Sequence, residues 1–192
     1  MKVNNLVTNL VTEFREGLAY IRDNSVVRTV IVMATIFGIF GLPMLQQIPA
    51  LARDVLRTAQ DTEAIVATRT SQIFIMQGVG ALTAAFLAAY HSRNSKKGLL
   101  LTIGQSVFIA GLMVMAFTAS LPLVLFLMIF IGYGSVTQLV SMNTLIQLQV
   151  PNSLRGRVFA VYLWALQGVA PFGSLLIGGS AQTWGVPFSI LI

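Results

Sequence analysis

The amino-acid sequence contains five apolar runs, each long enough to cross a lipid bilayer as a helix. A spanning helix needs about 20 residues. The runs cover about residues 26–52, 71–90, 99–119, 123–150 and 158–181, and a further run begins at 188. No Asp, Glu, Lys or Arg lies in the middle of any run. Because charges are costly in hydrocarbon, this pattern predicts transmembrane helices and an all-α integral membrane protein.

Composition excludes a soluble domain. Of the 192 residues, 56% are hydrophobic and 9% are charged, whereas a soluble domain carries about 25% charged residues. The net charge of +6 does not indicate nucleic acid as a partner, because the basic residues stand at the ends of apolar runs. With no cysteine and His91 as the only histidine, neither a disulfide framework nor a metal site is expected, and no cofactor is predicted.

Residues 1–24 differ from the rest of the chain, residues 25–192, in being less apolar. Their apolar residues recur at helical spacing, which predicts an amphipathic helix on the membrane surface. The residues on this face are Leu6, Leu10, Phe14, Leu18 and Ile21. The periodic pattern, without a compact apolar core, is not that of a signal peptide.

Basic residues are unequally divided between the two sides of the predicted membrane. If the N-terminus is cytoplasmic, Arg53, Arg57 and Arg69 face outside. The inner side then holds Lys2, Arg15, Arg22, Arg28, Arg93, Lys96, Lys97, Arg155 and Arg157. Nine inner against three outer cations place the N-terminus in the cytoplasm of a multi-pass protein of the inner (plasma) membrane.

Several segments, in their order and spacing, resemble the second half of major facilitator superfamily transporters. They are FREGLAYIR (14–22), GLP (41–43), IPALARDVL (48–56), HSRNSKKG (91–98), NTLIQ (143–147), RGRVF (155–159) and PFG (171–173). The run from 143 to 173 is the most specific, and the branch they resemble most closely is that of enterobactin- and macrolide-exporter-like proteins.

The resemblance implies twelve helices in two halves with the substrate cavity between them. Residues 1–24 would be the cytoplasmic connector, and the five runs would be the seventh to eleventh helices, followed by a truncated twelfth. The partners would be an N-terminal transporter half, membrane lipid and a small-molecule substrate. The loop at 91–98 resembles a gating motif, but Tyr90, His91 and Ser92 stand where the family has an acidic residue. The gating candidates are Arg93, Lys96, Lys97, Arg155 and Arg157, of which the last two could also cap helix ends.

A polar stripe runs along the fourth span. Tyr133, Thr137, Ser141, Thr144 and Gln147 share about a third of its circumference, and Gln138 borders this face. Leu139 and Val140 supply apolar surface elsewhere on the helix. A polar stripe inside a membrane must face protein or water. It predicts either a substrate cavity or hydrogen bonds between helices.

Other spans offer further cavity candidates, each of which could equally serve helix packing. Gln46 and Gln47 lie between Pro43 and Pro49, where the first span is expected to kink or unwind. The remaining candidates are Gln72 and Met76 in the second span and Trp164 and Gln167 in the fifth.

Small residues at four-residue spacing predict close contacts between helices. One such stripe is formed by Gly80, Ala84 and Ala88. The other is formed by residues 170, 174 and 178, which are Ala, Ser and Gly.

The functional prediction is half of a secondary exporter of amphipathic small molecules, working by alternating access. Two alternatives stay open: a membrane subunit of an ATP-driven exporter, although no GxxxxGK[ST] loop is present, and a fragment that does not transport. An intramembrane enzyme built on Gly132-Tyr133-Gly134-Ser135 is disfavoured, because no membrane His or Lys could act as its base.

Overall fold

The computed structural model describes residues 15–58, 60–90 and 97–190, which form helices joined by short turns with no strand among them. Five helical stretches in this part of the chain are long and apolar enough to span a membrane. They are Ser25–Gln46, Glu63–Tyr90, Lys97–Ala116, Leu121–Gln149 and Asn152–Trp184. The predicted all-α membrane fold is confirmed.

The stretches are divided into shorter elements. These are α2 (Ser25–Ile36), η1 (Phe37–Gly41), α3 (Leu42–Gln46), α4 (Ile48–Asp54), α5 (Glu63–Tyr90), α6 (Lys97–Ala116), α7 (Leu121–Gln149), α8 (Asn152–Leu163), η2 (Trp164–Gly168), α9 (Ala170–Trp184) and α10 (Val186–Ser189). Both η1 and η2 are π-helical turns. A helix over residues 15–23 precedes α2. Leu6, Leu10 and Phe14 of the predicted amphipathic face lie outside the described residues.

The first span is interrupted between its two prolines. Pro43 and Pro49 each stand in the first turn of a helix, α3 and α4, where their missing N–H groups need no partner. Gln47 forms the turn between the two helices. The chain therefore changes direction at Gln47.

Helices extend beyond the apolar runs that predict them. α5 begins at Glu63, eight residues before the predicted start at residue 71, and α8 begins at Asn152, six residues before 158. Apolar periodicity marks only the part of a helix that lies in hydrocarbon. Glu63 in the first turn of α5 also faces the positive end of the helix dipole, which stabilises the polar extension.

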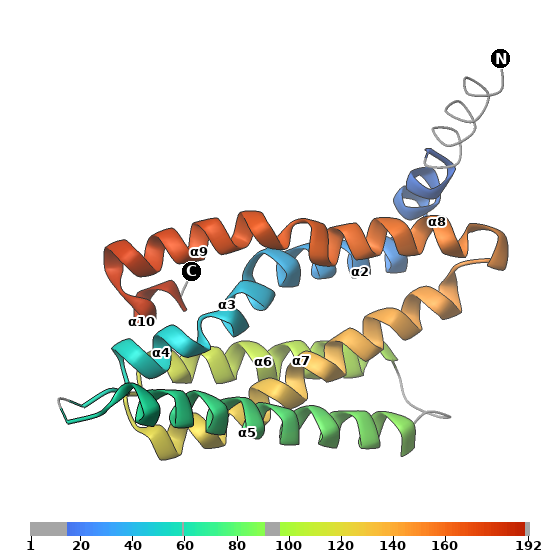
Figure 1. Ribbon diagram of the computed structural model, residues 1–192. Coiled ribbons are helices and arrows are strands. Elements are labelled where there is room, and N and C mark those ends of the chain that lie inside the picture. Colours follow the sequence, from blue (N-terminus) through green and yellow to red (C-terminus); the bar gives the residue numbers. More distant parts are fainter. Residues whose placement is uncertain (1–14, 59, 91–96, 191–192) are drawn as a thin grey trace.

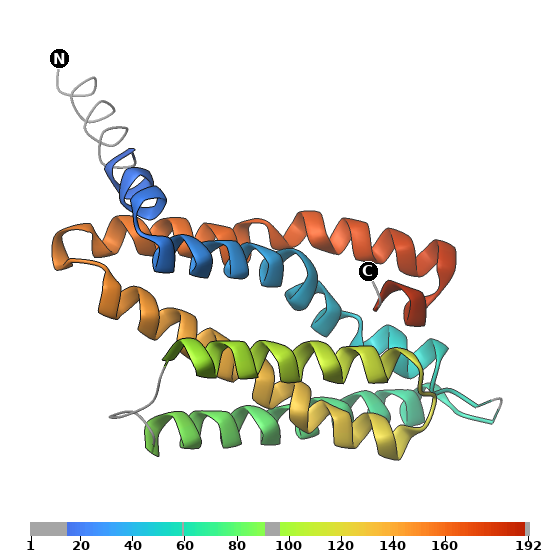
Figure 2. The same ribbon diagram turned by 180° about the vertical axis from the view of Figure 1, so that it is seen from behind.

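The helices form two layers (Figures 1 and 2). α2, η1 and α3 lie beside α8, η2 and α9 in one layer, and α5, α6 and α7 form the other. One end of the bundle carries helix 15–23, the end of α5 and the α7–α8 turn, and the opposite end carries the α4–α5 loop and the α6–α7 turn. The described basic residues at the first end are Arg15, Arg22, Arg28, Lys97, Arg155 and Arg157. Only Arg53, Arg57 and Arg69 belong to the other end of the described structure.

Glycines bring α5 and α7 into direct backbone contact. A Cβ at Gly80 would lie 1.9 Å from the carbonyl oxygen of Ile129, and a Cβ at Gly132 would lie 2.1 Å from that of Gln77. Neither position has room for a side chain. Together with the burial of Ala84, this confirms the close approach predicted for the stripe that begins at Gly80.

The close approach predicted for the second small-residue stripe is not found at Gly178, although Ser174 of the same stripe contacts Gln46 of α3. A Cβ at Gly178 would meet nothing within 4 Å, whereas a Cβ at Gly173 would lie 1.9 Å from the carbonyl oxygen of Ile39 in η1. α9 buries Gly173, Ile177 and Ser180 instead. The spacing of small residues defines a helix face, but the neighbour that this face meets is decided by the packing of the whole layer.

Candidate functional site

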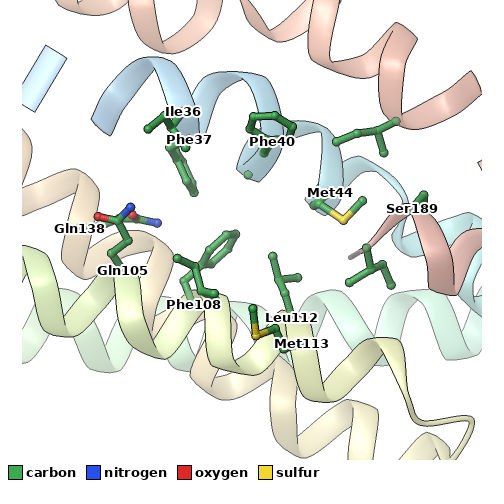
Figure 3. A pocket seen from close by; sticks show the side chains of 14 residues that line it. Ile36, Phe37, Phe40, Met44, Gln105, Phe108, Leu112, Met113, Gln138 and Ser189 are labelled. Carbon is green, nitrogen blue, oxygen red and sulfur yellow. The ribbon is translucent and has the colours of Figure 1, made fainter. Parts of the chain in front are cut away.

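A cavity of about 330 Å³ lies between the two layers (Figure 3). Aromatic, aliphatic and methionine side chains form most of its wall. Its lining residues are Ile36, Phe37, Phe40, Gly41, Met44, Gln105, Phe108, Ile109, Leu112, Met113, Gln138, Ile177, Ser189 and Ile190. We call it the interlayer cavity. No charged residue is among those that line it.

The π-helix η1 shapes the upper wall of this cavity. η1 contributes Phe37, and α6 contributes Phe108 from the other layer. Their rings meet edge to face with centroids 5.3 Å apart and an interplanar angle of 68°. This contact joins the two layers beside the cavity, and such aromatic pairs add about 1 kcal/mol beyond the area they bury.

Two amide side chains provide the polar part of the interlayer cavity. Figure 3 shows Gln105 of α6 and Gln138 of α7 at the same end of the cavity. Gln138 is only 1% exposed, and its Nε2 is buried without a hydrogen-bond partner. A buried amide N–H that lacks a partner costs about 1–3 kcal/mol. The amide is therefore available to an acceptor that enters the cavity.

A second hollow, the stripe crevice, contains most of the predicted polar stripe. Its volume is about 600 Å³. It is lined by Ala84, Ala85, Leu87, Ala88, Ala89, Lys97, Leu100, Tyr133, Thr137, Val140, Ser141, Thr144 and Leu148. The alanines of α5 leave space in front of the hydroxyl groups of α7, and Lys97 stands at the start of α6.

The structure divides the predicted stripe. Tyr133, Thr137 and Ser141 line the stripe crevice, but Gln138 lines the interlayer cavity. Gln147 lies exposed near the end of α7. The expectation that Val140 lies away from the stripe is wrong, because Val140 lines the same crevice and is 38% exposed. The opening between α5 and α6 is wide enough for residues on both sides of the stripe to line the crevice.

The other cavity candidates are not gathered in one place. Gln46 is exposed, and its Oε1 accepts a hydrogen bond from Ser174 Oγ at 3.3 Å. Gln47 forms the turn after α3 and is half-buried. The candidates in the other spans also lie outside both hollows. Of these, Gln72 in α5 and Trp164 and Gln167 in η2 are exposed, and Met76 in α5 is half-buried.

Residues at the α7–α8 turn hold helix 15–23 in place. Arg157 forms an ion pair with Glu16, and Tyr20 donates a hydrogen bond from its hydroxyl to the carbonyl oxygen of Gln149 at 2.5 Å. Arg155 donates from Nη2 to the carbonyl oxygen of Gln147 at 3.2 Å, near the C-terminus of α7. Among the gating candidates, Arg93 and Lys96 lie outside the described residues. A role for this group in gating stays a prediction.

Ion pairs also fix the opposite end of the bundle. Glu63 pairs with Arg53 at 3.2 Å and with Arg57 at 3.0 Å. These pairs are largely exposed, so each contributes little on its own. They join α4 and the loop after it to the start of α5.

Sequence reasoning missed the residues that complete the interlayer cavity. Gln105 is an amide in the middle of the third apolar run, and that position alone was a signal, because a polar group in hydrocarbon needs a partner. Phe37, Met44 and Phe108 carry no such signal, since apolar residues occur all around a membrane helix.

The disfavoured enzyme interpretation gains no support from the geometry. Ser135 is buried, and its Oγ donates to the carbonyl oxygen of Gly132 in its own helix at 2.9 Å. This hydrogen bond is ordinary for serine in a membrane helix.

Comparison with known proteins gives one family. The sequence model of the family described as "Transmembrane secretion effector" matches residues 2–192. No curated protein and no solved structure matches the chain.

Proposed function

We propose that this chain is the C-terminal half of a secondary active exporter of amphipathic small molecules. The proposal starts from its family, because the chain belongs to the transmembrane secretion effector family of the major facilitator superfamily. Family membership makes the chain part of a multi-pass membrane transporter with an efflux role. Three further points are our proposal: that the chain is the C-terminal half of the transporter, that its substrates are amphipathic small molecules, and that it works by alternating access. Its assignment to the enterobactin- and macrolide-exporter-like branch belongs to the same proposal.

The observation that carries the proposal is the exposure of amide side chains within the spans. Gln167 in η2 is exposed in the middle of the span Asn152–Trp184, and Gln72 in α5 is exposed one turn after Arg69, where the polar start of that helix ends. An amide that faces lipid leaves its hydrogen bonds unmade, which is costly in hydrocarbon. A second transporter half packed against this chain, or a water-filled path between the halves, would satisfy them.

The backbone contacts between helices support alternating access. In that mechanism one half rocks against the other as a nearly rigid body. Gly80 and Gly132 fix α5 on α7, and Gly173 fixes α9 on η1, with no side chain between the backbones. These contacts would keep each layer rigid while the surface toward the partner half opens and closes.

The proposed substrate class follows from the hollows. The walls of the interlayer cavity are mostly apolar and carry no charge, and the stripe crevice adds hydroxyl groups and Lys97. A molecule with an apolar body and a few oxygen atoms suits both better than a strongly charged one.

We also propose that the chain lies in the inner (plasma) membrane with a cytoplasmic N-terminus. The excess of Lys and Arg at the end that carries helix 15–23 and the α7–α8 turn supports this orientation. The same cations would contact anionic lipid headgroups.

The test is transport of the neutral dye Nile red by proteoliposomes under an imposed proton or sodium gradient. We expect gradient-dependent, saturable transport when the chain is reconstituted with an N-terminal six-helix half, and none with the chain alone, because the path needs both halves. An ionophore that collapses the gradient should abolish transport.

Two other outcomes would replace the proposal. Saturable transport by the chain alone would indicate that two copies of it form the path. Transport that requires ATP, or none with the partner half present, would favour the ATP-driven subunit or the non-transporting fragment.

A further inference from the structure

The interlayer cavity combines an unpartnered buried amide with a wall of aromatic and methionine side chains. We propose that it binds a neutral amphipathic molecule, with an acceptor oxygen of that molecule at Nε2 of Gln138 and its apolar body against Phe37, Phe108 and Met113. This site would lie within the chain, between its two layers. The inference deepens the proposed function, on which its biological meaning rests.

Gln138 is the residue that distinguishes this cavity from a simple packing gap. Its side chain is 1% exposed, yet its Nε2 makes no hydrogen bond. Water alone would be held weakly there, because an ordered buried water makes about three hydrogen bonds. Besides the two glutamines, the polar lining residue is Ser189, whose Oγ already donates to the carbonyl oxygen of Val186 at 2.7 Å. In Figure 3, Ser189 stands at the other end from the amides.

An oxygen carried on an apolar body fits this distribution. It would accept the hydrogen bond from Gln138 while the rest of the molecule covers the aromatic rings and the methionine side chains, which donate no hydrogen bonds. A ketone, ester or ether oxygen in an aromatic framework has this character.

The size of the cavity and its lack of charged residues narrow the class of ligand further. A volume of about 330 Å³ is at the small end of ligand sites. No acidic or basic residue lines it, so an ionic group placed there would lose its hydration without gaining a counter-ion. The ligand is therefore small and uncharged.

Benzophenone is a suitable probe, because it is a neutral aromatic ketone and its photoexcited carbonyl inserts into nearby C–H bonds, including those beside the sulfur of methionine. Met44 and Met113 both line the cavity. Membranes containing the full chain would be irradiated with increasing benzophenone, and the adducts located by mass spectrometry of peptides. We expect saturable labelling at Met44 or Met113, and in Met113→Leu we expect the adduct at Met44.

The contribution of the amide is tested with a matched pair of competitors. Fluorenone and fluorene have the same ring system, but only fluorenone carries an acceptor oxygen. Fluorenone should suppress labelling at about fivefold lower concentration than fluorene, as expected for one neutral hydrogen bond. In Gln138→Leu, which keeps the volume of the side chain, the two competitors should become equal. Gln72→Leu, at an exposed amide outside the cavity, should keep the fivefold difference.

These measurements require no partner half and no transport. Failure of transport with intact labelling would overturn only the proposed function. Non-saturable labelling, or equal competition by fluorenone and fluorene in the unaltered chain, would overturn the site. Absence of adducts at both methionines would also overturn it and would indicate that a protein helix fills the cavity.

Discussion

Nη1 of Arg69 lies 2.6 Å from Oδ2 of Asp61, and this ion pair ties α5 to the loop that leads into it. The same carboxylate oxygen accepts a hydrogen bond from the backbone N–H of Thr58 at 2.6 Å. Arg69 also donates to the carbonyl oxygen of Leu56. The side chain of Asp61 is only 8% exposed, and its carboxylate connects Thr58 in the loop to Arg69 in α5.

The loop should loosen at low pH. The backbone N–H of Thr58 and the charge of Arg69 hold the pKa of Asp61 below its usual value of 3.8. A lowered folded-state pKa means that the ionised carboxylate stabilises the fold above pH 3.8, and that this stabilisation is lost as the pH falls through the lower folded-state value. A spin label on Cys at Gln60 should therefore become mobile only below pH 3.8, where the carboxylate of the folded chain takes up its proton.

The control for the pH experiment is a label at Ala119, in the α6–α7 turn at the same end of the bundle, which should show no transition in this range. Asp61→Asn should leave the Gln60 label mobile at every pH. A label at Gln60 that stays immobile in Asp61→Asn would show that the carboxylate does not hold the loop.

The orientation can be tested by thiol labelling, since the chain contains no cysteine. Cys at exposed Gln60 should react with a membrane-impermeant maleimide in intact cells, and Cys at exposed Ser153 should react only after permeabilisation. The reverse pattern would invert the proposed topology.

Two glycine substitutions on α5 should differ sharply in their effect on the stability of the fold. Gly80→Ala places a methyl group against the carbonyl of Ile129 and should destabilise the chain by about 1–3 kcal/mol. Gly78→Ala, two residues earlier, meets nothing within 4 Å and should be neutral or slightly stabilising. Thermal unfolding in detergent would measure both, and equal midpoints would contradict the packing.

The contact between helix 15–23 and α8 should depend on the charges of Glu16 and Arg157. Because both side chains are partly exposed, the pair contributes less than about 1 kcal/mol. Glu16→Arg should increase trypsin cleavage after Arg22 by up to about fivefold. Glu16→Arg combined with Arg157→Glu should restore protection, and failure to do so would assign the docking to Tyr20 instead.

Cysteines introduced on α7 should react with thiol reagents only where they line the stripe crevice. Cys at half-buried Thr144 should react with a small aqueous thiol reagent, whereas Cys at fully buried Met142 should not. Reaction at both positions would mean that α7 is exposed all round, and reaction at neither would mean that another helix covers the crevice.

The sequence predicted the spans well. A helix in the membrane must form all its backbone hydrogen bonds internally, so a sufficiently long apolar run is enough to identify it. It could not predict which face of a span meets which neighbour. In soluble helices one polar face marks the outside, but here exposed and buried residues are equally apolar, as Phe86 at 74% and Met128 at 0% exposure illustrate. The polar stripe was therefore recognised, but its division between two hollows, with Gln138 in one and Ser141 in the other, depended on packing.

The two π-helical turns lie against each other, since a Cβ at Gly38 in η1 would lie 2.4 Å from the carbonyl oxygen of Leu166 in η2. A π-helical turn holds one more residue than the α-helical turn that it replaces. Each residue of an α-helix advances the face by about 100°. Deleting one residue from η1 would thus close the turn to α-helical geometry and leave α3 and Met44 facing the cavity, whereas the same deletion in the regular helix α2 would rotate everything after it by about 100°. The two π-helical turns are consequently the places where these spans can lose one residue without turning the helix that follows to another face.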